Sequence, residues 1–527
     1  MQHLSSKEIK ELRSKFRESK QHKYLSEVSL IADKDSTALF NVAGMQPLIP
    51  YLMGKEHPLG KRVYNIQKCI RTVDIDEVGD SSHLTFFEMM GNRSLGDYFK
   101  KEAVTRSREF LTQYLEMDSR KLAVTVFEGD EGAPRDEETA KYRKEAGLDP
   151  SRISYLSAKH NRWSPGPIGP CGPDTEIFFR VGESELPPEG SNVKNDEDNW
   201  LEIWNNVFME YYRDESGKLT KLTKQNVDTG MGHERMCKVL QKKETIYETD
   251  LFTQAMQTIE QYTGLSYAEH QRRFRIIADH SRTAFMLIND GLIPSNVGAG
   301  YVLRMIIRRL VYNTMLLKES SIEHYQTFLS SLLTAFQTLR AFKKEEIMRV
   351  LIGEVKMFQR TIQNGMQILT SIINKEKAEG KTLISGANAF KLYDTYGFPI
   401  ELTREIAGEN AMQVDEEGYL KVAEQAREKS RQATKDMFKK GIDRSKYIEG
   451  LPQTKFIGYT SLENKQAKLL KDFEVGGQRV LIFDKTPFYP EMGGQLGDSG
   501  RITLEDGSEQ KILTTQNFAG VILHLVE

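Results

Sequence analysis

Cysteine is scarce in this chain of 527 residues. Its three cysteines, Cys69, Cys171 and Cys237, lie far apart in the sequence and form no Cys-x-x-Cys pair. Paired spacings of that kind mark disulfide frameworks and structural zinc sites, so the sequence argues against both. We therefore expect a protein of a reducing compartment.

Long apolar runs are also missing. The amino-terminal segment MQHLSSKEIKELRSKF is charged and lacks the apolar core of a signal peptide. No stretch of about 18 consecutive apolar residues, the length that favours a membrane-spanning helix, occurs in the chain. These absences predict a cytoplasmic protein without a membrane partner.

Charge of one sign is not in excess, because the formal net charge is −2 and the pI is about 6.6. A nucleic-acid partner would therefore have to bind a local basic patch. Residues 271–310 offer one, with only Asp279 and Asp290 against the arginines 272, 273, 275, 282, 304, 308 and 309. A solvated helical surface has the same composition, so the patch alone leaves both interpretations open.

The pattern of apolar, polar and turn residues changes twice along the chain. The length of the chain suits about three domains. Residues 1–243 mix short β-type runs with helical segments and predict an α+β domain. Residues 244–450 have helical apolar spacing and predict a mostly α domain. Residues 451–527 consist of short β segments separated by glycine turns and predict a small β-barrel-like module.

A glycine-rich segment, NVDTGMGHERMCKVL at 226–240, precedes the start of a predicted amphipathic helix. Gly230 and Gly232 would let a ligand approach the backbone, and the helix start and Arg235 suit phosphate oxygens. A phosphate-bearing ligand is one interpretation. An ordinary glycine turn beside a surface arginine is the other, and this segment alone does not decide between them.

Three further segments predict strands that carry polar or aromatic side chains. Residues 64–99 form a predicted hairpin with Arg71 at the end of its first strand, which suits either a nucleotide clamp or a structural hairpin. Residues 162–179 place Trp163 before a Pro/Gly loop and Glu176 on the strand that follows. In LEIWNNVFMEYY, Asn205 and Val207 are two residues apart and should share one face of a strand.

Taken in order, these segments closely resemble the alanyl-tRNA synthetase family. The resemblance rests on NVAGM (41–45), QKCIR (67–71), HLTFFEMMGN (83–92), GDYF (96–99), GPCGPDTEIFF (169–179), EIWNNVFM (202–209), VDTGMGHER (227–235), IADHSR (277–282), PSNVGAGYVLRMIIRR (294–309) and YDTYGFPIELT (393–403). It implies a class II synthetase domain built on an antiparallel sheet and a helical tRNA-recognition domain. It also implies that TPFYPEMGGQLGDSG (486–500) belongs to the β module that opens the family's editing region.

The resemblance also implies roles for residues around the synthetic site. Arg71 would hold the α-phosphate and the attacking carboxylate, Met89 would lie against adenine, and Gly230, Gly232 and Arg235 would bind ATP. Asp228 would pair with the ammonium group of alanine, while Trp163, Asn205 and Val207 would wall the alanine pocket. Since the reaction brings two anions together, the two arginines and Mg²⁺ would supply most of the catalysis. We expect Glu176 to be a magnesium ligand, with a structural carboxylate as the alternative.

For tRNA, the family reads a G·U pair in the acceptor stem, and its reading residues match Asn296 and Asp394. Short amide and carboxylate side chains suit the exposed groups of a wobble pair in the minor groove. Arg304, Arg308 and Arg309 would contact the RNA backbone, although one of the three could instead pair within the domain.

The chain departs from the family pattern in two places. The loop TVDIDEV after Arg71 is shorter and more acidic than is common in bacterial members. None of the ten histidines lies four residues from another, so the editing site's His-x-x-x-His pair is absent and we expect no zinc. Because the family's dimerising carboxyl-terminal region is not in this sequence, we expect a monomer that binds the acceptor stem. We also expect serine and glycine to enter the alanine pocket and seryl-tRNA to persist.

Three functions compete on these residues: an alanine-tRNA ligase, a non-catalytic RNA-binding relative, and an enzyme that charges an acceptor other than tRNA. The presence of Arg71, Asp228 and Arg235 together favours catalysis over the second. The presence of Asn296 and Asp394 favours tRNA over another acceptor. The sequence therefore predicts an alanine-tRNA ligase that uses ATP and Mg²⁺.

Overall fold

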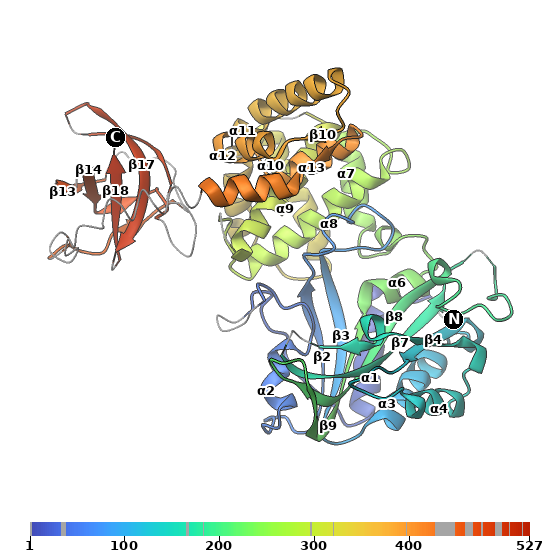
Figure 1. The fold of residues 1–527 in the computed structure, drawn as a ribbon. Helices are drawn as coiled ribbons and strands as arrows, with labels where there is room; N and C mark the ends of the chain where they lie inside the picture. The colour runs from blue at the N-terminus through green and yellow to red at the C-terminus, as the bar shows by residue number, and fades with distance from the viewer. Residues whose placement is uncertain are drawn as a thin grey trace. The chain divides into compact units, whose positions relative to one another are not determined.

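An antiparallel-rich sheet with helices against it dominates the amino-terminal part of the molecule (Figure 1). The structure, a computed structural model, describes residues 3–32, 38–164, 168–182, 184–295, 298–319, 321–396, 398–426, 448, 450–458, 467–475, 478–490, 498–504, 506–518 and 520–526. Contacts between residues divide the chain into two compact units. The first comprises Met1–Leu292 and Ile306–Gly353, and the second comprises Ile293–Met305 and Glu354–Glu527.

The sheet of the first unit runs in the order β1-β2-β3-β9-β8-β7-β4-β5, with β6 paired to β7. Its strands are β1 (Lys23–Tyr24), β2 (Arg62–Ile70), β3 (Phe86–Leu95), β4 (Leu122–Phe127), β5 (Ile153–Leu156), β6 (Arg162–Trp163), β7 (Gly169–Arg180), β8 (Trp200–Arg213) and β9 (Leu219–Gly232). The β1–β2 and β4–β5 pairs are parallel, and the central pairs from β2 to β4 are antiparallel. This order brings strands from distant parts of the sequence side by side.

The helices of this unit are α1 (Ser6–Ser19), α2 (Ile49–Leu52), α3 (Lys100–Glu109), α4 (Glu137–Glu145), α5 (Ala158–Asn161), α6 (His233–Leu240), α7 (Thr253–Thr263), α8 (Gln271–Asn289) and α10 (Ile322–Gln337). Two further helices, α9 (Gly298–Leu317) and α11 (Lys344–Ala378), each have residues in both units. Local sequence explains where α1 starts, because Ser5 and Glu8 form a capping box that satisfies free N–H groups at its first turn.

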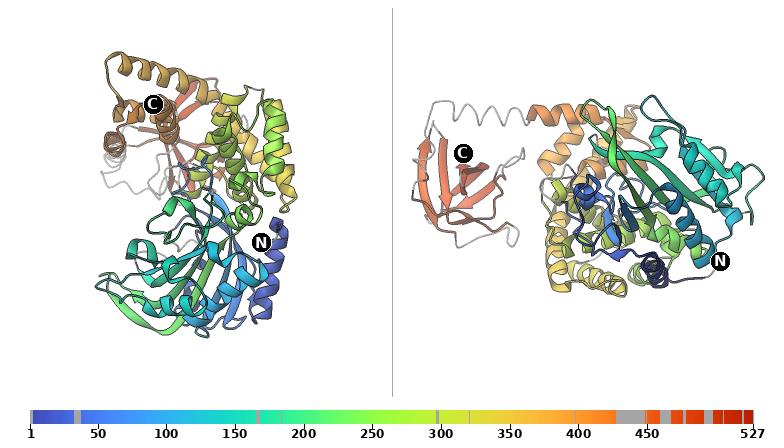
Figure 2. Two further views of the ribbon diagram at one scale, coloured as in Figure 1. Left: turned by 90° about the vertical axis from the view of Figure 1, so that its right-hand side faces the viewer. Right: turned by 90° about the horizontal axis from the view of Figure 1, so that it is seen from below.

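The two faces of the sheet follow the two-residue alternation of its strands. On β8, Trp204 and Phe208 point toward the helices: Trp204 lies under Arg13 of α1, and Phe208 packs with Val104 of α3. Helices α1, α3 and α4 lie against this face (Figures 1 and 2). The residues between them on β8, Asn205 and Val207, therefore face the opposite side.

The second unit contains a helical part and a curled sheet. The helical part includes β10 (Leu383–Ile384), α12 (Gly386–Tyr396), α13 (Ile400–Glu409) and β11 (Gln413–Val414). The sheet runs β13-β14-β18-β17-β16, with strands Leu469–Val475, Gln478–Phe483, Val521–Val526, Glu509–Phe518 and Gly500–Thr503. A separate parallel pair joins β12 (Lys455–Phe456) to β15 (Lys485–Thr486).

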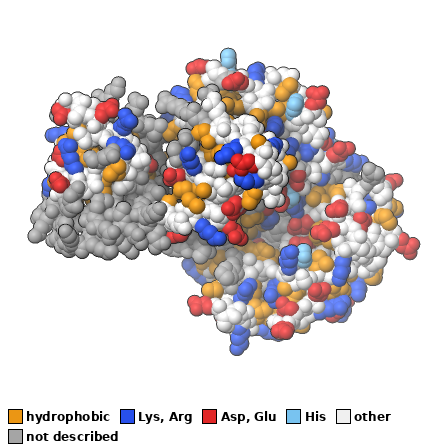
Figure 3. Space-filling view, turned by 45° about the horizontal axis from the view of Figure 1, so that its top comes forward, with side chains coloured by type: hydrophobic (Ala, Val, Ile, Leu, Met, Phe, Trp, Pro, Cys, Tyr) orange, Lys and Arg blue, Asp and Glu red, His pale blue; other side chains and the backbone are white. Residues whose placement is uncertain are grey.

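The predicted α+β fold class is confirmed: an antiparallel sheet flanked by helices is followed by a helical region and a small curled sheet. The domain boundaries at 243 and 450 stay a prediction, since contacts define only the two larger units. Figure 3 shows basic and acidic side chains interspersed over the visible face, as the near-zero net charge suggests. Among the described residues, no helix is both long and apolar enough to cross a bilayer.

Candidate active site

One cavity of about 280 Å³ opens on the face of the sheet away from α1 and α3. All ten residues predicted for ATP, alanine and magnesium line it: Arg71, Met89, Trp163, Glu176, Asn205, Val207, Asp228, Gly230, Gly232 and Arg235. The structure therefore brings together side chains that are up to 164 positions apart in the chain.

Strand register explains why these residues meet. In the β9–β8 pair, Gly230 lies opposite Asn205 and Asp228 lies opposite Val207. In the β3–β9 pair, Met89 lies opposite Gly232, and in the β7–β8 pair Glu176 lies opposite Asn205. Residues that oppose each other in an antiparallel pair point to the same face. The cavity floor is thus a patch of four adjacent strands.

Asp228 is buried and forms an ion pair that sequence reasoning missed. Arg93 Nε donates to Asp228 Oδ1 at 2.7 Å, and the Arg93 side chain is completely buried. Burial raises the pKa of the Asp228 carboxyl, and Arg93 beside it acts in the opposite direction. A Cβ atom on either Gly44 or Gly91 would collide with the Arg93 guanidinium. The glycines of the NVAGM and EMMGN segments were thus the available signal that a large side chain fills this space.

The two predicted phosphate-binding arginines have different surroundings. Arg71 directly follows β2, is exposed, and its guanidinium lies 4.9 Å from the ring centre of Phe87. Arg235 Nη1 donates to the Glu202 carboxylate at 2.6 Å and to the Glu202 carbonyl at 3.0 Å. Glu202 therefore holds Arg235 at the cavity.

Three carboxylates gather on β7 and β8 beside this arginine: Asp174 is buried, and Glu176 and Glu202 are partly buried. Burial raises the pKa of Asp174 to about 7, against hydrogen bonds from Asn205 and Asn161. Burial, with Glu202 and Asp174 nearby, raises the pKa of Glu176 to about 9. Close carboxylates that raise each other's pKa are stabilised by a shared cation, and Mg²⁺ prefers oxygen ligands. Glu176 and Glu202 therefore suit a magnesium ion, and Asp174 lies within the same cluster.

The two-residue alternation of strand β8 does not predict that Glu202 lines the cavity. It lies three residues before Asn205, so strict alternation would turn it to the helix-covered face. The β7–β8 register is irregular between Ile177 and Phe178, opposite this point, and such irregularities redirect side chains. Asp174, by contrast, lies two residues before Glu176 on the same face and could have been predicted.

The remaining walls are amide, glycine and apolar groups. Asn205 Nδ2 donates to Asp174 Oδ2 at 2.9 Å, and Asn205 Oδ1 is a buried acceptor with no partner among the described residues. Trp163 packs against the core cluster that contains Met89 and Val207. A Cβ on Gly230 would lie 2.7 Å from Met89 Sδ, so only glycine leaves Met89 in place there.

The described residues predicted to bind tRNA belong to two units: Arg304 and Asp394 to the second, Arg308 and Arg309 to the first. Asn296 lies outside the described residues. Asp394 is exposed on α12 of the second unit, and Arg304 Nε donates to Glu354 at 3.2 Å in that unit. Arg308 is partly buried on α9. Arg309 is buried in the first unit, and its guanidinium donates to the carbonyl of Ile75.

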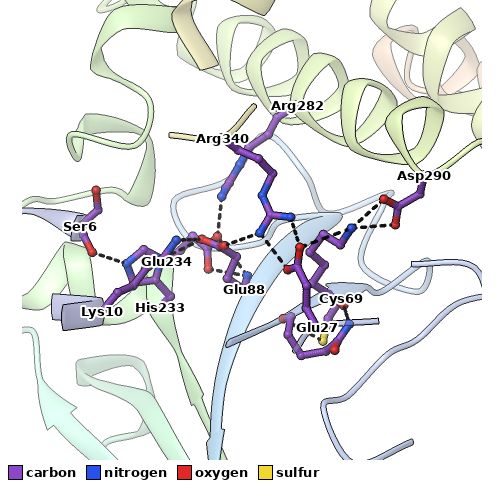
Figure 4. Close-up of polar contacts among 12 residues, drawn as sticks. Ser6, Lys10, Glu27, Cys69, Glu88, His233, Glu234, Arg282, Asp290 and Arg340 are labelled. Atoms are coloured by element: carbon purple, nitrogen blue, oxygen red, sulfur yellow. Dashed lines mark hydrogen bonds and ion pairs between the residues drawn. The ribbon is translucent and has the colours of Figure 1, made fainter. Parts of the chain in front are cut away.

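Behind the cavity, a buried charge network fixes the start of α6. Glu88, His233 and Glu234 lie close enough together to hold a metal ion. Their carboxylates already contact the cations Lys10, Arg282 and Arg340, as Figure 4 shows. Glu234 also accepts the Glu88 backbone N–H at 3.1 Å and Arg282 at 2.8 Å. The network therefore balances its own charge and ties β3, α6 and α8 together.

Comparisons with known proteins agree with this arrangement. A family profile described as tRNA synthetases class II (A) matches residues 8–527. The alanine–tRNA ligase of Thermotoga petrophila is 42% identical over 552 residues, covering 100% of this chain and 62% of the relative. That of Borrelia hermsii is 44% identical over 455 residues, covering 82% of this chain and 75% of the relative.

The chain therefore belongs to the class II tRNA synthetases, in the family of alanine–tRNA ligases, as the sequence motifs predict. It spans 62% of the length of the Thermotoga relative and 60% of a relative from Caldicellulosiruptor saccharolyticus that is 39% identical. Among solved structures, a histidyl-tRNA synthetase from S. aureus is 10% identical with a TM-score of 0.28, over 45% of this chain and 65% of that one, which is too distant to add to the assignment.

Proposed function

We propose that this chain activates alanine with ATP and transfers it to the 3′ end of a tRNA. The observation that carries the proposal is that one cavity gathers Arg71, Asp228 and Arg235 with the acids of β7 and β8. The names of the relatives, all alanine–tRNA ligases, supply the amino acid and the acceptor.

In the first step, an oxygen of the alanine carboxylate attacks the α-phosphorus of ATP, and the bond to pyrophosphate breaks. Arg71 offsets the charge of the carboxylate and the α-phosphate, and Arg235 binds the leaving phosphates. Mg²⁺, held by Glu176 and Glu202, would neutralise further phosphate charge. Since both substrates are anionic at the reacting atoms, positioning and neutralisation suffice without a covalent nucleophile.

The amino acid is recognised from the opposite side of the cavity. Its ammonium group would donate to Asp228 and to Asn205 Oδ1, a buried acceptor with no partner among the described residues, while Asn205 Nδ2 donates to Asp174. Val207 and Trp163 would close around the methyl group. In the second step, a terminal ribose hydroxyl of the tRNA attacks the carbonyl and AMP leaves.

We further propose that Asn296 and Asp394 contact the acceptor stem, with Arg304 and Arg308 near its backbone. We leave Arg309 out of that set, because its buried guanidinium donates to the Ile75 carbonyl within the first unit. We place the reaction in the cytoplasm, and the three cysteines, which are free and buried, suit a reducing compartment. A monomer is the proposed state.

Alanine-dependent exchange of pyrophosphate into ATP, followed by charging of tRNA, tests the proposal. Asp228→Ala and Arg235→Ala should each lower exchange by about 10²-fold or more, the scale for removing a group that stabilises the transition state. Exchange at wild-type rate in either variant would reject the site. Exchange without charging would retain activation and reject tRNA as the acceptor.

A further inference from the structure

The loop between β2 and β3, residues 71–85, carries the candidate catalytic Arg71 and one wall of the cavity. Asp74, Ser82, His83 and Leu84 of this loop line the cavity. Its acidic sequence, TVDIDEV, does not explain how it keeps one shape. The explanation lies in contacts with α8 and α9, the region that supplies the basic patch of the sequence.

The two ends of the loop are joined to each other and to α8. The Arg71 N–H donates to the Thr85 carbonyl at 3.0 Å, which closes the neck of the loop. The Thr85 N–H in turn donates to Asp279 Oδ1 at 2.9 Å. Asp279 belongs to the IADHSR motif, which has no role in the reaction proposed above.

Asp279 is the end of a buried chain of hydrogen bonds that returns to the loop. His280 Nδ1 lies 2.9 Å from Asp279 Oδ2, and His280 Nε2 lies 3.1 Å from Arg309 Nη1. Because a guanidinium only donates, Nε2 accepts and the ring proton on Nδ1 points to Asp279. The same Arg309 nitrogen donates to the Ile75 carbonyl. One relay therefore holds both the neck and the middle of the loop.

Arg275 holds the next turn of the loop. Its Nη1 donates to the Gly79 carbonyl at 3.3 Å, while Tyr267 and Gln271 orient the guanidinium at 2.9 and 2.7 Å. Gly79 has φ of +119°, and a Cβ there would lie 2.8 Å from Arg272 Cγ. The loop thus approaches α8 more closely than any other residue type permits.

Two more carbonyls of the loop are bound by the segment after α6. The Ile246 N–H donates to the Ser81 carbonyl at 3.1 Å, and the Tyr247 hydroxyl donates to the His83 carbonyl at 3.0 Å. The side chains of Ile75 and Val78 are buried, at 3% and 0% exposure. The underside of the loop is therefore anchored along its length, while its upper side lines the cavity.

We infer that Arg275 and Arg309 are positioning residues for amino-acid activation, acting through the backbone of loop 71–85 rather than through contact with RNA. This inference rests on the proposed function. It reassigns part of the basic patch: two of its arginines are 8% and 6% exposed and have loop carbonyls as partners. Loss of these two anchors should displace the wall that faces ATP together with Arg71, while the alanine contacts built on β8 and β9 stay in place.

The test uses Arg309→Met and Arg275→Met, each of which removes the donor and keeps an apolar stem. Arg309→Lys restores the charge with a different donor geometry. Arg273→Met is the matched control, since Arg273 lies on the same helix but donates to Asn313 of α9. Hydrogen–deuterium exchange of peptides covering 72–84 reports the loop directly, and pyrophosphate exchange without tRNA gives KM for ATP and alanine.

We expect loop amides to exchange at least ~10-fold faster in both Met variants and KM for ATP to rise about 10-fold, in the range that small misplacements cause. KM for alanine should rise less than KM for ATP, because Arg71 alone of the proposed alanine contacts belongs to the loop. Arg309→Lys should recover part of the loss, and Arg273→Met should match wild type. Arg275→Met keeps the test valid if Arg309→Met folds poorly.

Unchanged loop exchange in both Met variants would overturn the inference. So would normal tRNA-free kinetics with impaired charging, since that result would assign the arginines to RNA. A lower kcat with both KM values unchanged would also overturn it, by showing only a loss of folded enzyme. If the wild-type chain fails to exchange pyrophosphate with alanine, the proposed function fails, yet hydrogen exchange still decides whether the two arginines hold the loop.

Discussion

Replacing Arg93 by methionine tests whether a residue outside the cavity controls the charge of Asp228 inside it. The substitution keeps an apolar stem in the space that Gly44 and Gly91 leave. It removes the 2.7 Å ion pair to Asp228 and the contact with Asn65. Breaking one side of a fully buried pair costs about 3–5 kcal/mol, so the variant should unfold at clearly lower urea concentration.

The effect on activity depends on two opposing terms. Losing the Arg93 charge removes a repulsion on the ammonium of alanine, which favours binding. It also removes the one nearby cation that lowers the pKa of Asp228, a carboxyl whose pKa burial already raises. With that cation removed the pKa of the Asp228 carboxyl should rise further, so a smaller fraction is ionised and the second term should win. The lost charge-assisted hydrogen bond is worth about 1.5–3 kcal/mol, or about 10- to 150-fold in kcat/KM for alanine.

The sign of the pH dependence follows from this account. Alanine binding requires the ionised carboxylate, so activity is present above the pKa of Asp228 and is lost as pH falls through it. In Arg93→Met the acid limb of kcat/KM for alanine should move to higher pH, and activity should recover at alkaline pH. Tryptic stability and urea curves at each pH keep folding separate from binding.

Two controls sharpen the result. Arg93→Lys retains a cation beside Asp228 and should keep the acid limb near its wild-type position. Asn65→Ala removes only the second partner of Arg93 and keeps the ion pair between Arg93 and Asp228. This variant should therefore leave kcat/KM for alanine within about threefold of wild type. An acid limb that stays in place in Arg93→Met, despite the lower stability, would refute the reasoning.

Four further outcomes follow from the geometry. Glu176→Gln should raise the Mg²⁺ concentration for half-maximal exchange by at least ~10-fold, and an unchanged Mg²⁺ titration would remove this residue from the metal site. Burial lowers the pKa of His22 to about 3, so between pH 6.5 and 3 the unfolded state binds a proton that the folded state does not. Stability is therefore lost as pH falls: from pH 7 to 5 the wild type should lose about 2 kcal/mol more than His22→Gln in urea unfolding, and parallel curves would contradict this. Gly230→Ala should raise KM for ATP by displacing Met89. The Gly230→Ala/Met89→Ala double variant should be less impaired than the sum of the two single effects. Strict additivity would show that residues 230 and 89 do not touch in the working enzyme. Serine and glycine should both support exchange, within about 10- to 200-fold of alanine, because a methyl-sized pocket rejects them weakly. Complete rejection of both would point to a pocket of different shape.

Most of the cavity could be predicted because it lies on strands. Asn205 and Val207 are two residues apart on β8, and Gly230 and Asp228 oppose them on β9. The two-residue alternation and the order of motifs along the chain are properties of the sequence itself. The strand pairs could not be derived from it in the same way, because β3 meets β9 across more than 130 residues. Here the family resemblance, not the local pattern, assigned these distant residues to one site.

The roles of the arginines were the hardest to predict from the sequence, and the physical reason is general. The same residue type contacts phosphates, pairs with carboxylates and binds backbone carbonyls, and only tertiary burial selects among these roles. Arg71 stays exposed beside the cavity, Arg235 is held there by Glu202, and Arg309 is buried under a loop.

Three of the buried arginines, Arg93, Arg275 and Arg309, lie against a glycine or donate to a backbone carbonyl. Arg93 fits only because Gly44 and Gly91 lack side chains, and Arg275 reaches a carbonyl only because Gly79 lets the loop approach α8. Glycines that no turn or ligand explains are therefore a signal, readable in the sequence, that a bulky cation is buried against them. In this chain Gly44 and Gly91 make room for Arg93 beside Asp228, the acid that would bind alanine, and Gly79 lets the loop that would face ATP approach Arg275. The arginines that support these groups therefore matter as much as those that face the substrates.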